Sequence, residues 1–249
     1  MRPRARLDEL RLAFMLLSRI PMGTLARAPA LSDCVWAYPL VGAVVGGLAG
    51  LVCALAARLG LPPLAGALLA LGASALLTGA MHEDGLADLA DGFGGGATKV
   101  RKLEIMRDSR IGSYGVLALI LAVGVKAACL AALPPAGAWL SLAALGALSR
   151  AVLPMVMLAL PSARESGLGQ AAGGALRPWP ALAGLVLALL LAGLCALPHL
   201  GAVVLAMALV SAGVSVLARR QIGGFTGDVL GAVQNLAELA GFCALVGRF

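Results

Sequence analysis

Seven long apolar stretches constrain what this chain can fold into. Each is close to the roughly 20 apolar residues that cross the hydrocarbon core of a bilayer as a helix. They cover residues 38–58, 63–83, 113–132, 138–160, 180–197, 200–218 and 229–247. The chain of 249 residues is 61% hydrophobic and 12% charged, a composition that a water-soluble domain of this size has no means of burying. The sequence therefore predicts an all-α, polytopic membrane bundle with about seven transmembrane helices, forming one membrane-embedded domain over residues 1–249.

Lysine and arginine residues are distributed unevenly among the segments that connect these stretches. If the N-terminus is cytoplasmic, 15 of the 19 basic residues fall on the cytoplasmic side. They are Arg2, Arg4, Arg6, Arg11, Arg19, Arg27, Lys99, Arg101, Lys102, Arg107, Arg110, Arg164, Arg177, Arg219 and Arg220. Because basic residues gather in cytoplasmic loops, the pattern predicts a cytoplasmic N-terminus and a cytoplasmic segment 81–112. The basic residues have few aromatic neighbours, so the net charge of +7 does not indicate nucleic-acid binding.

The first 30 residues differ from the apolar stretches. Leu10, Phe14 and Leu17 share one helical face, opposite Asp8 and Arg11, which predicts an amphipathic helix at the membrane interface over 1–30. A cleaved secretory signal is the alternative. The five cysteines are scattered singly through apolar sequence, so we expect neither a disulfide framework nor a zinc site.

The stretch "MHEDGLADLADGFGG" at 81–95 places carboxylates in an otherwise apolar chain. In a helix, Asp84, Asp88 and Asp91 lie at i, i+4 and i+7 and form one stripe, while Glu83 points about 100° away from Asp84. Like charges on one face repel, so the stripe requires a neutralising cation or surrounding water. A helix from Leu64 to Asp91 is about 42 Å long, so its last two turns are expected to project from a core about 30 Å thick.

A second acidic pair follows in "KVRKLEIMRDSRIGSYG", where Glu104 and Asp108 are again four residues apart. Two helices joined by a Gly-rich turn could bring both acidic faces to one site. Carboxylate oxygens favour Mg²⁺ or Mn²⁺ over zinc. The predicted cofactor is Mg²⁺, held by Asp84, Asp88, Asp91, Glu104 and Asp108, with His82 as a hydrogen-bonding group or a further ligand. A solvated loop whose acids only balance its bases is the alternative.

Four segments carry a family resemblance: "HEDGLADLADG", "LEIMRDSRIGSYG", "ARESGLG" at 163–169 and "GGFTGDVLGAVQNLAE" at 223–238. Together they resemble the cobalamin synthases, the adenosylcobinamide-GDP ribazoletransferases of bacterial and archaeal corrinoid synthesis. The resemblance implies a magnesium-dependent enzyme of the bacterial inner membrane with a cytoplasmic active site. It implies that α-ribazole, or its 5′-phosphate, is joined to adenosylcobinamide-GDP with release of GMP. A homo-oligomer and association with other enzymes of corrinoid synthesis are left open.

A more distant likeness is to the CDP-alcohol phosphotransferases, which use D-x2-D-G followed by D-x3-D. Asp88, Asp91 and Gly92 match the first part, and Glu104 with Asp108 is similar to the second. The Ala-Arg that should follow is Gly95-Gly96 here, so we take the likeness as similar chemistry and not as membership. It implies catalytic roles for Asp88, Asp91 and Asp108, with Asp108 as the general base.

Further residues complete the predicted site. Arg107, Arg110 and Arg164 are expected to bind phosphate, with a topology-setting role as the alternative. Arg150 lies in mid-span and is expected to line the substrate cavity or to form a structural pair with a neighbouring span. Asp228 is expected to contact substrate or metal, or to be a helix N-cap. Two other functions stay open: a transporter, and a CDP-alcohol phosphotransferase that acts on lipid.

Overall fold

The structure is a computed structural model that describes residues 3–165, 167–174 and 176–247. Within these residues the regular elements are helices, and the strand-like pairing is one isolated bridge between Ser162 and Phe225. The α-helices are α1 (Pro3–Leu17), α2 (Leu31–Cys34), α3 (Tyr38–Arg58), α4 (Pro63–Thr78), α5 (Met81–Gly95), α6 (Lys99–Ile105), α7 (Ser113–Ala131), α8 (Ala138–Ala159), α9 (Leu168–Gly173), α10 (Pro178–Leu194), α11 (Leu200–Ile222) and α12 (Gly227–Val246). The predicted all-α fold class is confirmed. Arg2 and Arg248 lie outside the described residues.

Five helices in the described chain are long and apolar enough to cross a membrane: Leu31–Arg58, which includes α3, together with α7, α8, α11 and α12. The protein is therefore a multi-pass membrane protein. Helices α4 and α5 meet the same criterion only as a pair, and that pair is bent by 92°. Helix α10 is apolar but shorter, at 17 residues. The predicted count of seven spans is not confirmed. Six of the predicted apolar stretches each coincide with one helix, whereas 63–83 runs across the break between α4 and α5.

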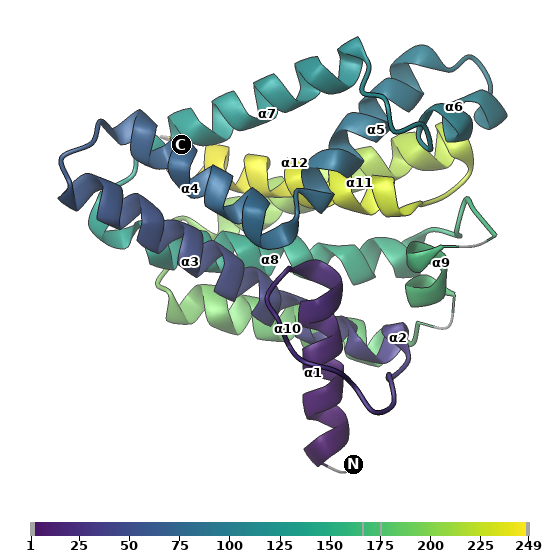
Figure 1. Cartoon of the computed structure of the whole chain (residues 1–249), viewed down its shortest axis with the longest axis horizontal. Coiled ribbons are helices and arrows are strands. Elements are labelled where there is room, and N and C mark those ends of the chain that lie inside the picture. Colours follow the sequence, from purple (N-terminus) through teal and green to yellow (C-terminus); the bar gives the residue numbers. More distant parts are fainter. Residues whose placement is uncertain (1–2, 166, 175, 248–249) are drawn as a thin grey trace.

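The bend between α4 and α5 corrects the prediction of one continuous helix from Leu64 to Asp91. Two successive residues there have positive φ, Gly79 at 69° and Ala80 at 57°. This left-handed conformation ends an α-helix and is routine only for glycine. Helix α5 therefore turns away from α4 instead of extending it. Figure 1 shows α5 toward the end of the bundle where α6 also lies.

Helices α8 and α12 form the centre of the bundle, and 72% of the span window of each is buried. Helix α8 packs closely against α3 because glycines allow their backbones to meet. A Cβ atom at Gly42 or Gly46 would overlap carbonyl groups of α8, at Gly146 and Leu142 respectively. Small residues at a crossing are the usual way in which membrane helices approach one another.

The N-terminal helix α1 crosses the bundle transversely (Figure 1). Phe14 and Leu17, from the predicted apolar face, are buried against the bundle, and Glu9 Oε2 accepts a hydrogen bond of 2.6 Å from Trp36 Nε1. Leu7 and Met15 remain exposed. The amphipathic face therefore contacts protein, and a position at the membrane interface stays a prediction.

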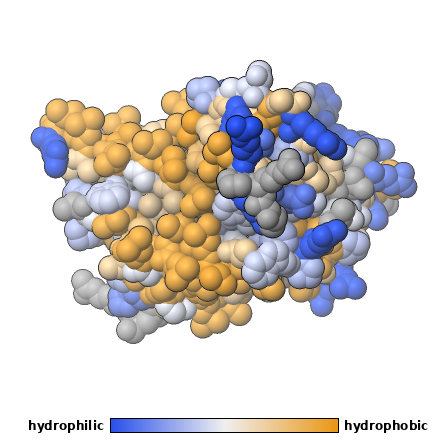
Figure 2. All heavy atoms as spheres, turned by 90° about the horizontal axis from the view of Figure 1, so that it is seen from below, coloured by the Kyte–Doolittle hydropathy of each residue, from blue (hydrophilic) through white to orange (hydrophobic). Residues whose placement is uncertain are grey.

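The surface agrees with a membrane environment. Figure 2 shows apolar side chains over much of one face, while charged side chains gather toward one end. Many exposed residues of the long helices are large and apolar, among them Leu55, Leu117, Leu190 and Leu205. All five cysteines are free, as the sequence predicts.

Candidate functional site

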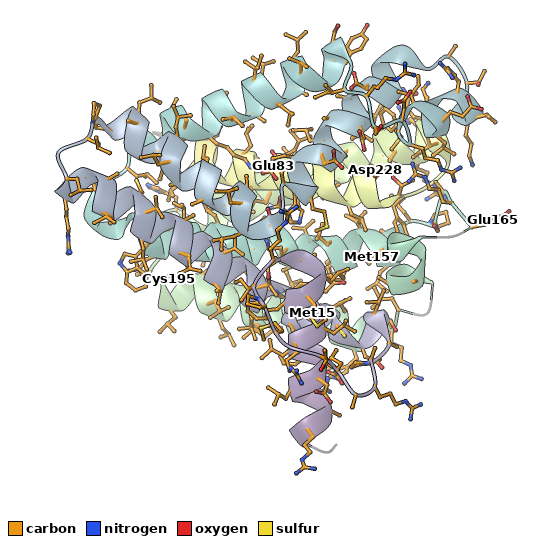
Figure 3. All side chains as sticks on the ribbon, viewed as in Figure 1. Met15, Glu83, Met157, Glu165, Cys195 and Asp228 are labelled. Atoms are coloured by element: carbon orange, nitrogen blue, oxygen red, sulfur yellow. The ribbon has the colours of Figure 1, made fainter. Side chains whose placement is uncertain are left out.

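Two glycines bring the acidic residues of α5 and α12 together. A Cβ atom on Gly85 would lie 2.9 Å from the carbonyl oxygen of Asp228, and one on Gly231 would lie 3.2 Å from Gly85 Cα. Any side chain at this crossing would push the helices apart. Asp84 and Asp88 of α5 therefore lie beside Asp228 of α12. Figure 3 shows Asp228 of α12 next to α5, the helix that carries Glu83.

Arg164 faces this cluster from the loop between α8 and α9. The loop is held against the segment before α12, because Ala163 N donates to Phe225 O at 2.8 Å and Phe225 N donates to Pro161 O at 2.9 Å. Arg164 Nη2 then lies 3.0 Å from Asp228 Oδ2. Within the described chain its buried Nε has no partner. The pairing joins two of the four segments that carry the family resemblance.

Asp228 is not the N-cap that the sequence allowed as an alternative. The side chain of Thr226 caps α12 by accepting a hydrogen bond from Val229 N at 3.2 Å. Asp228 lies in the first turn of the helix, where the helix dipole favours a negative charge. Its carboxylate is therefore free to face α5 and Arg164.

Asp88 is the most electrostatically strained member of the cluster. Helix α5 is not among the five helices that meet the spanning criterion on their own, and Asp88 is half-buried on it. Burial, followed by the charges of Asp84, Asp228 and Asp91, raises the pKa of Asp88 from 3.8 to about 7, while Arg164 opposes the rise. A crowded group of carboxylates with one arginine calls for additional positive charge.

Asp91 has a different environment from Asp84 and Asp88, although the three share one stripe. It is buried, and it accepts hydrogen bonds from the backbone N–H groups of Gly112 at 2.7 Å and Gly115 at 2.9 Å. These are N–H groups at the start of α7, which have no partner within the helix. A side chain at either glycine would overlap with the carboxylate. Asp91 thus fixes the start of α7 against α5.

Glu104 and Asp108 do not converge with α5 as predicted. Helix α6 ends at Ile105, so the two acids do not share one helix. Glu104 is exposed and pairs with Arg101 at 3.1 Å, and Asp108 pairs with Arg110 at 2.7 Å. Hydrogen bonds from Arg110 lower the pKa of Asp108 to about 2, and its role as a general base stays a prediction. Among the described residues, no three His, Cys, Asp or Glu side chains are grouped to hold a metal ion.

The three arginines that were predicted to bind phosphate lie in different places. Arg164 faces the carboxylate cluster. Arg107 is exposed, and Arg110 is engaged with Asp108 at the surface. Their roles in substrate binding stay predictions.

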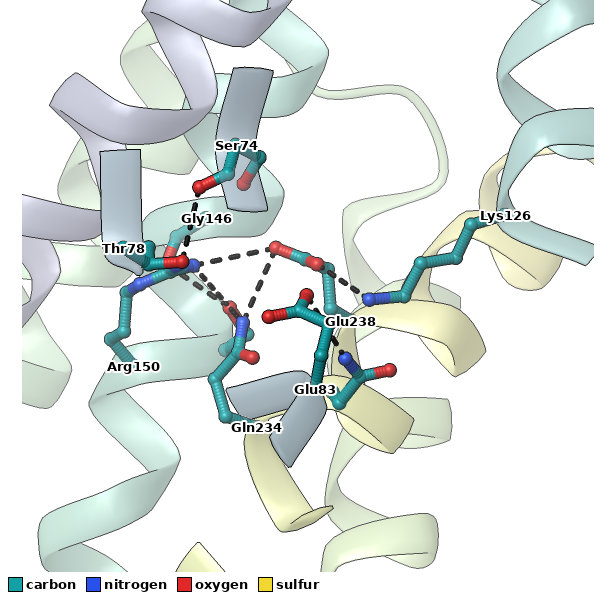
Figure 4. Close-up of polar contacts among 10 residues, drawn as sticks. Ser74, Thr78, Glu83, Lys126, Gly146, Arg150, Gln234 and Glu238 are labelled. Atoms are coloured by element: carbon teal, nitrogen blue, oxygen red, sulfur yellow. Dashed lines mark hydrogen bonds and ion pairs between the residues drawn. The ribbon is translucent and has the colours of Figure 1, made fainter. Parts of the chain in front are cut away.

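Arg150 lies in a buried ion network inside the bundle (Figure 4). Its Nη1 is 3.3 Å from Glu238 Oε1, and Lys126 Nζ is 2.8 Å from Glu238 Oε2. Gln234 Nε2 also donates to Glu238, at 3.3 Å, and Asn235 Nδ2 donates to Glu83 Oε1, also at 3.3 Å. This geometry is the structural pair with a neighbouring span that the sequence allowed for Arg150.

Sequence reasoning missed several residues of this region. Gly85 and Gly231 lie within two of the resembling segments. Each stands within a turn of an acidic residue, Asp84 and Asp228 respectively, and this was the only local sign of the helix crossing. Glu238 ends the fourth resembling segment but received no predicted role, and Tyr38 gave no local signal. Glu238 becomes significant only through partners on α7 and α8, and Tyr38 through a cavity described below.

These features define a multi-pass α-helical membrane protein with a carboxylate cluster and an arginine at one end of its bundle. The family described as cobalamin-5-phosphate synthase matches residues 9–246. The chain belongs to this family.

Similar proteins bear one name. The chain is 45% identical to the adenosylcobinamide-GDP ribazoletransferase of Bradyrhizobium diazoefficiens over 93% of this chain and 90% of that protein. It is 42% identical to the protein of that name from Mesorhizobium japonicum, over 96% and 92%. It is 46% identical to the protein of that name from Azorhizobium caulinodans, over 92% of this chain and 91% of that protein. Comparison with solved structures gave no significant match.

Proposed function

We propose that this protein is an adenosylcobinamide-GDP ribazoletransferase. It would join α-ribazole, or its 5′-phosphate, to adenosylcobinamide-GDP and release GMP. Family membership and relatives of that name over more than 90% of the chain support the proposal. One structural observation carries it: Asp84, Asp88, Arg164 and Asp228, from three separate resembling segments, meet where α5 crosses α12.

The donor chemistry of the cluster fits Mg²⁺. Carboxylate oxygens are the ligands that Mg²⁺ prefers. Burial and the neighbouring carboxylates raise the pKa of Asp88, and a divalent cation would favour its charged form. We propose that Asp84, Asp88 and Asp228, whose carboxylates are not grouped as a metal site in the described chain, draw together to hold the ion. Asp91 would not bind the ion but would fix α5 against the start of α7. Bound Mg²⁺ would neutralise the charge of the diphosphate and of the departing GMP.

The residues of the chain would position the two substrates. Arg164 is placed to bind a phosphate oxygen, because its Nε is buried without a partner among the described residues. A ribose hydroxyl oxygen of the ribazole, other than the 5′-oxygen that carries the phosphate in the 5′-phosphate acceptor, attacks the phosphorus that bears the corrinoid arm, forms a new P–O bond and loses its proton to solvent. The P–O bond to GMP breaks, and GMP leaves with the bridging oxygen. Positioning and charge stabilisation supply most of the acceleration in such transfers.

The location of the site follows from the basic residues. Lys99 lies close to Gly223, just after α11, so the basic 81–112 segment and Arg219 with Arg220 share one end of the bundle. Basic loops stay in the cytoplasm. We therefore propose a protein of the bacterial inner membrane with its site on the cytoplasmic side.

The test is the reaction itself with purified protein in liposomes. GMP and the cobalamin product should form in equal amounts from adenosylcobinamide-GDP and α-ribazole when Mg²⁺ is present, and chelation of the metal should stop both. The two alternatives have their own readouts. Release of CMP from CDP-diacylglycerol, or uptake of corrinoid without GMP release, would replace the proposal with a lipid transferase or a transporter.

A further inference from the structure

A cavity of about 240 Å³ lies beside the carboxylate cluster. It is bounded by α1, α3, α5, α8, α9 and α12, and Asp84 and Asp228 form part of its wall. The volume is below the roughly 300 to 1,000 Å³ that encloses a drug-sized ligand. It suits one nucleoside and is far too small for a corrinoid ring.

Two buried polar groups in the cavity wall have no hydrogen-bond partner in the described chain. They are Tyr38 Oη and His82 Nε2, and the two residues are 1% and 2% exposed. Buried polar atoms are nearly always hydrogen-bonded, and an unsatisfied one lowers stability. Two such groups on one cavity, next to the proposed reaction centre, indicate a ligand that satisfies them.

The rest of the wall is apolar. Its large side chains are Leu16, Leu17, Met81, Leu153, Met157 and Leu230. Methionine sulfur packs favourably against aromatic rings, so the wall suits a flat apolar ring system. Guanine carries several donors and acceptors along its edge, and two side-chain groups would leave most of them unsatisfied.

We infer that this cavity binds the base of α-ribazole, with Tyr38 and His82 as its specificity-determining residues. The inference rests on the proposed function. The base is a methylated benzimidazole, which offers the wall methyl groups, a flat ring and one free ring nitrogen. Tyr38 Oη donates a hydrogen bond to that nitrogen, and His82 Nε2 binds a ribose hydroxyl. The reacting ribose hydroxyl then lies at the end of the cavity formed by Asp84 and Asp228.

The experiment measures the Kd of radiolabelled α-ribazole by equilibrium dialysis against the purified full-length protein in detergent. Tyr38→Phe should weaken binding about tenfold, because one hydrogen bond to the ligand is lost. The thermal midpoint of the ligand-free protein should not fall, since the hydroxyl has no protein partner to lose. Tyr114→Phe is the matched control, because Tyr114 is exposed on α7, and its Kd should equal that of the wild type.

A modified ligand tests the assigned contact directly. The indole analogue of α-ribazole replaces the ring nitrogen with C–H, so it should bind the wild type about tenfold more weakly than α-ribazole does. In Tyr38→Phe the two ligands should bind equally, because the hydrogen bond is absent in both. Ala172→Trp, which fills the cavity from α9, should abolish α-ribazole binding and leave binding of adenosylcobinamide-GDP intact.

The outcomes separate the two proposals. The cavity assignment would be overturned if Tyr38→Phe still bound α-ribazole more tightly than the indole analogue and Ala172→Trp still bound α-ribazole. The proposed function would stand in that case, provided that the wild type turns over α-ribazole. A wild type that neither binds nor turns over α-ribazole would overturn the proposed function itself.

Discussion

Among the carboxylates of the cluster, Asp88 has the pKa that is raised most. Its pKa is raised from 3.8 to about 7, first by burial and then by Asp84 and its other acidic neighbours. Because the folded state holds this proton more tightly than the unfolded state, ionisation of Asp88 opposes folding. In the metal-free protein, the contribution of Asp88 to the free energy of unfolding therefore falls as the pH rises from about 4 to 7.

The same pKa predicts how Mg²⁺ binding depends on pH. Protons and Mg²⁺ compete for the Asp88 carboxylate, so Mg²⁺ affinity should fall about tenfold per pH unit below 7 and level off above it. Calorimetric titration of the purified protein at several pH values measures this directly. Asp108→Asn should keep the profile, because Asp108 lies outside the cluster. A wild-type affinity that does not change between about pH 5.5 and 8 would contradict the assignment.

Asp91 should behave differently from Asp84 when it is neutralised. Asp91→Asn replaces one acceptor oxygen with an amide group that cannot accept from the N–H of Gly112 or Gly115. We expect a loss of about 1 to 3 kcal/mol in stability. Asp84 is exposed, so Asp84→Asn should change stability by less than about 0.5 kcal/mol. Denaturation in detergent compares the two, and equal stabilities would show that Asp91 does not hold α7.

At the scale of whole helices, Glu238 is the shared partner of two cations from α7 and α8. Lys126 and Arg150 are both buried, and both pair with Glu238 of α12. A buried charge that loses its partner costs about 3 to 5 kcal/mol. The network therefore holds α12, and with it Asp228, in register with its neighbours.

This geometry predicts an order of stabilities. Glu238→Gln leaves two buried cations without their anion, whereas Arg150→Met or Lys126→Met leaves Glu238 with one cation. Glu238→Gln should therefore lower the thermal midpoint more than either single cation variant. Glu104→Gln is the control, since its exposed pair with Arg101 is worth about 0 to 1 kcal/mol. A wild-type midpoint for Glu238→Gln would exclude the network as a structural element.

The helices differ in how well the sequence predicts them. Long apolar runs reveal the spanning helices, and the i, i+4, i+7 spacing reveals the stripe on α5, because both depend on local periodicity. The bend at Gly79 and Ala80 is not predictable in this way, since alanine gives no signal for a left-handed conformation. The crossing of Gly85 with Gly231 joins residues far apart in sequence. Asp228, Arg164 and Glu238 acquire their partners only through such contacts.

The whole molecule has two chemically distinct ends joined by an apolar surface. Arg58 lines a groove together with Pro135 and Trp139, so the α3–α4 and α7–α8 connections lie at the end away from the carboxylate cluster. Single-cysteine labelling in a Cys-free background tests the orientation. Ala97→Cys should react only with reagent supplied from the cytoplasm, and Pro198→Cys, between α10 and α11, only from outside. Labelling of both from one side would refute this topology.

The cluster at the α5–α12 crossing, and not Glu104 on α6 or Asp108 after it, is proposed as the metal-dependent centre. The decisive measurement is GMP release across a Mg²⁺ titration for variants in liposomes. Asp84→Asn, Asp88→Asn and Asp228→Asn should each lose about 100-fold or more in activity, while Glu104→Gln and Asp108→Asn stay within a few-fold of the wild type. Near-normal activity of Asp88→Asn at low Mg²⁺, with loss of activity in Glu104→Gln, would contradict the account.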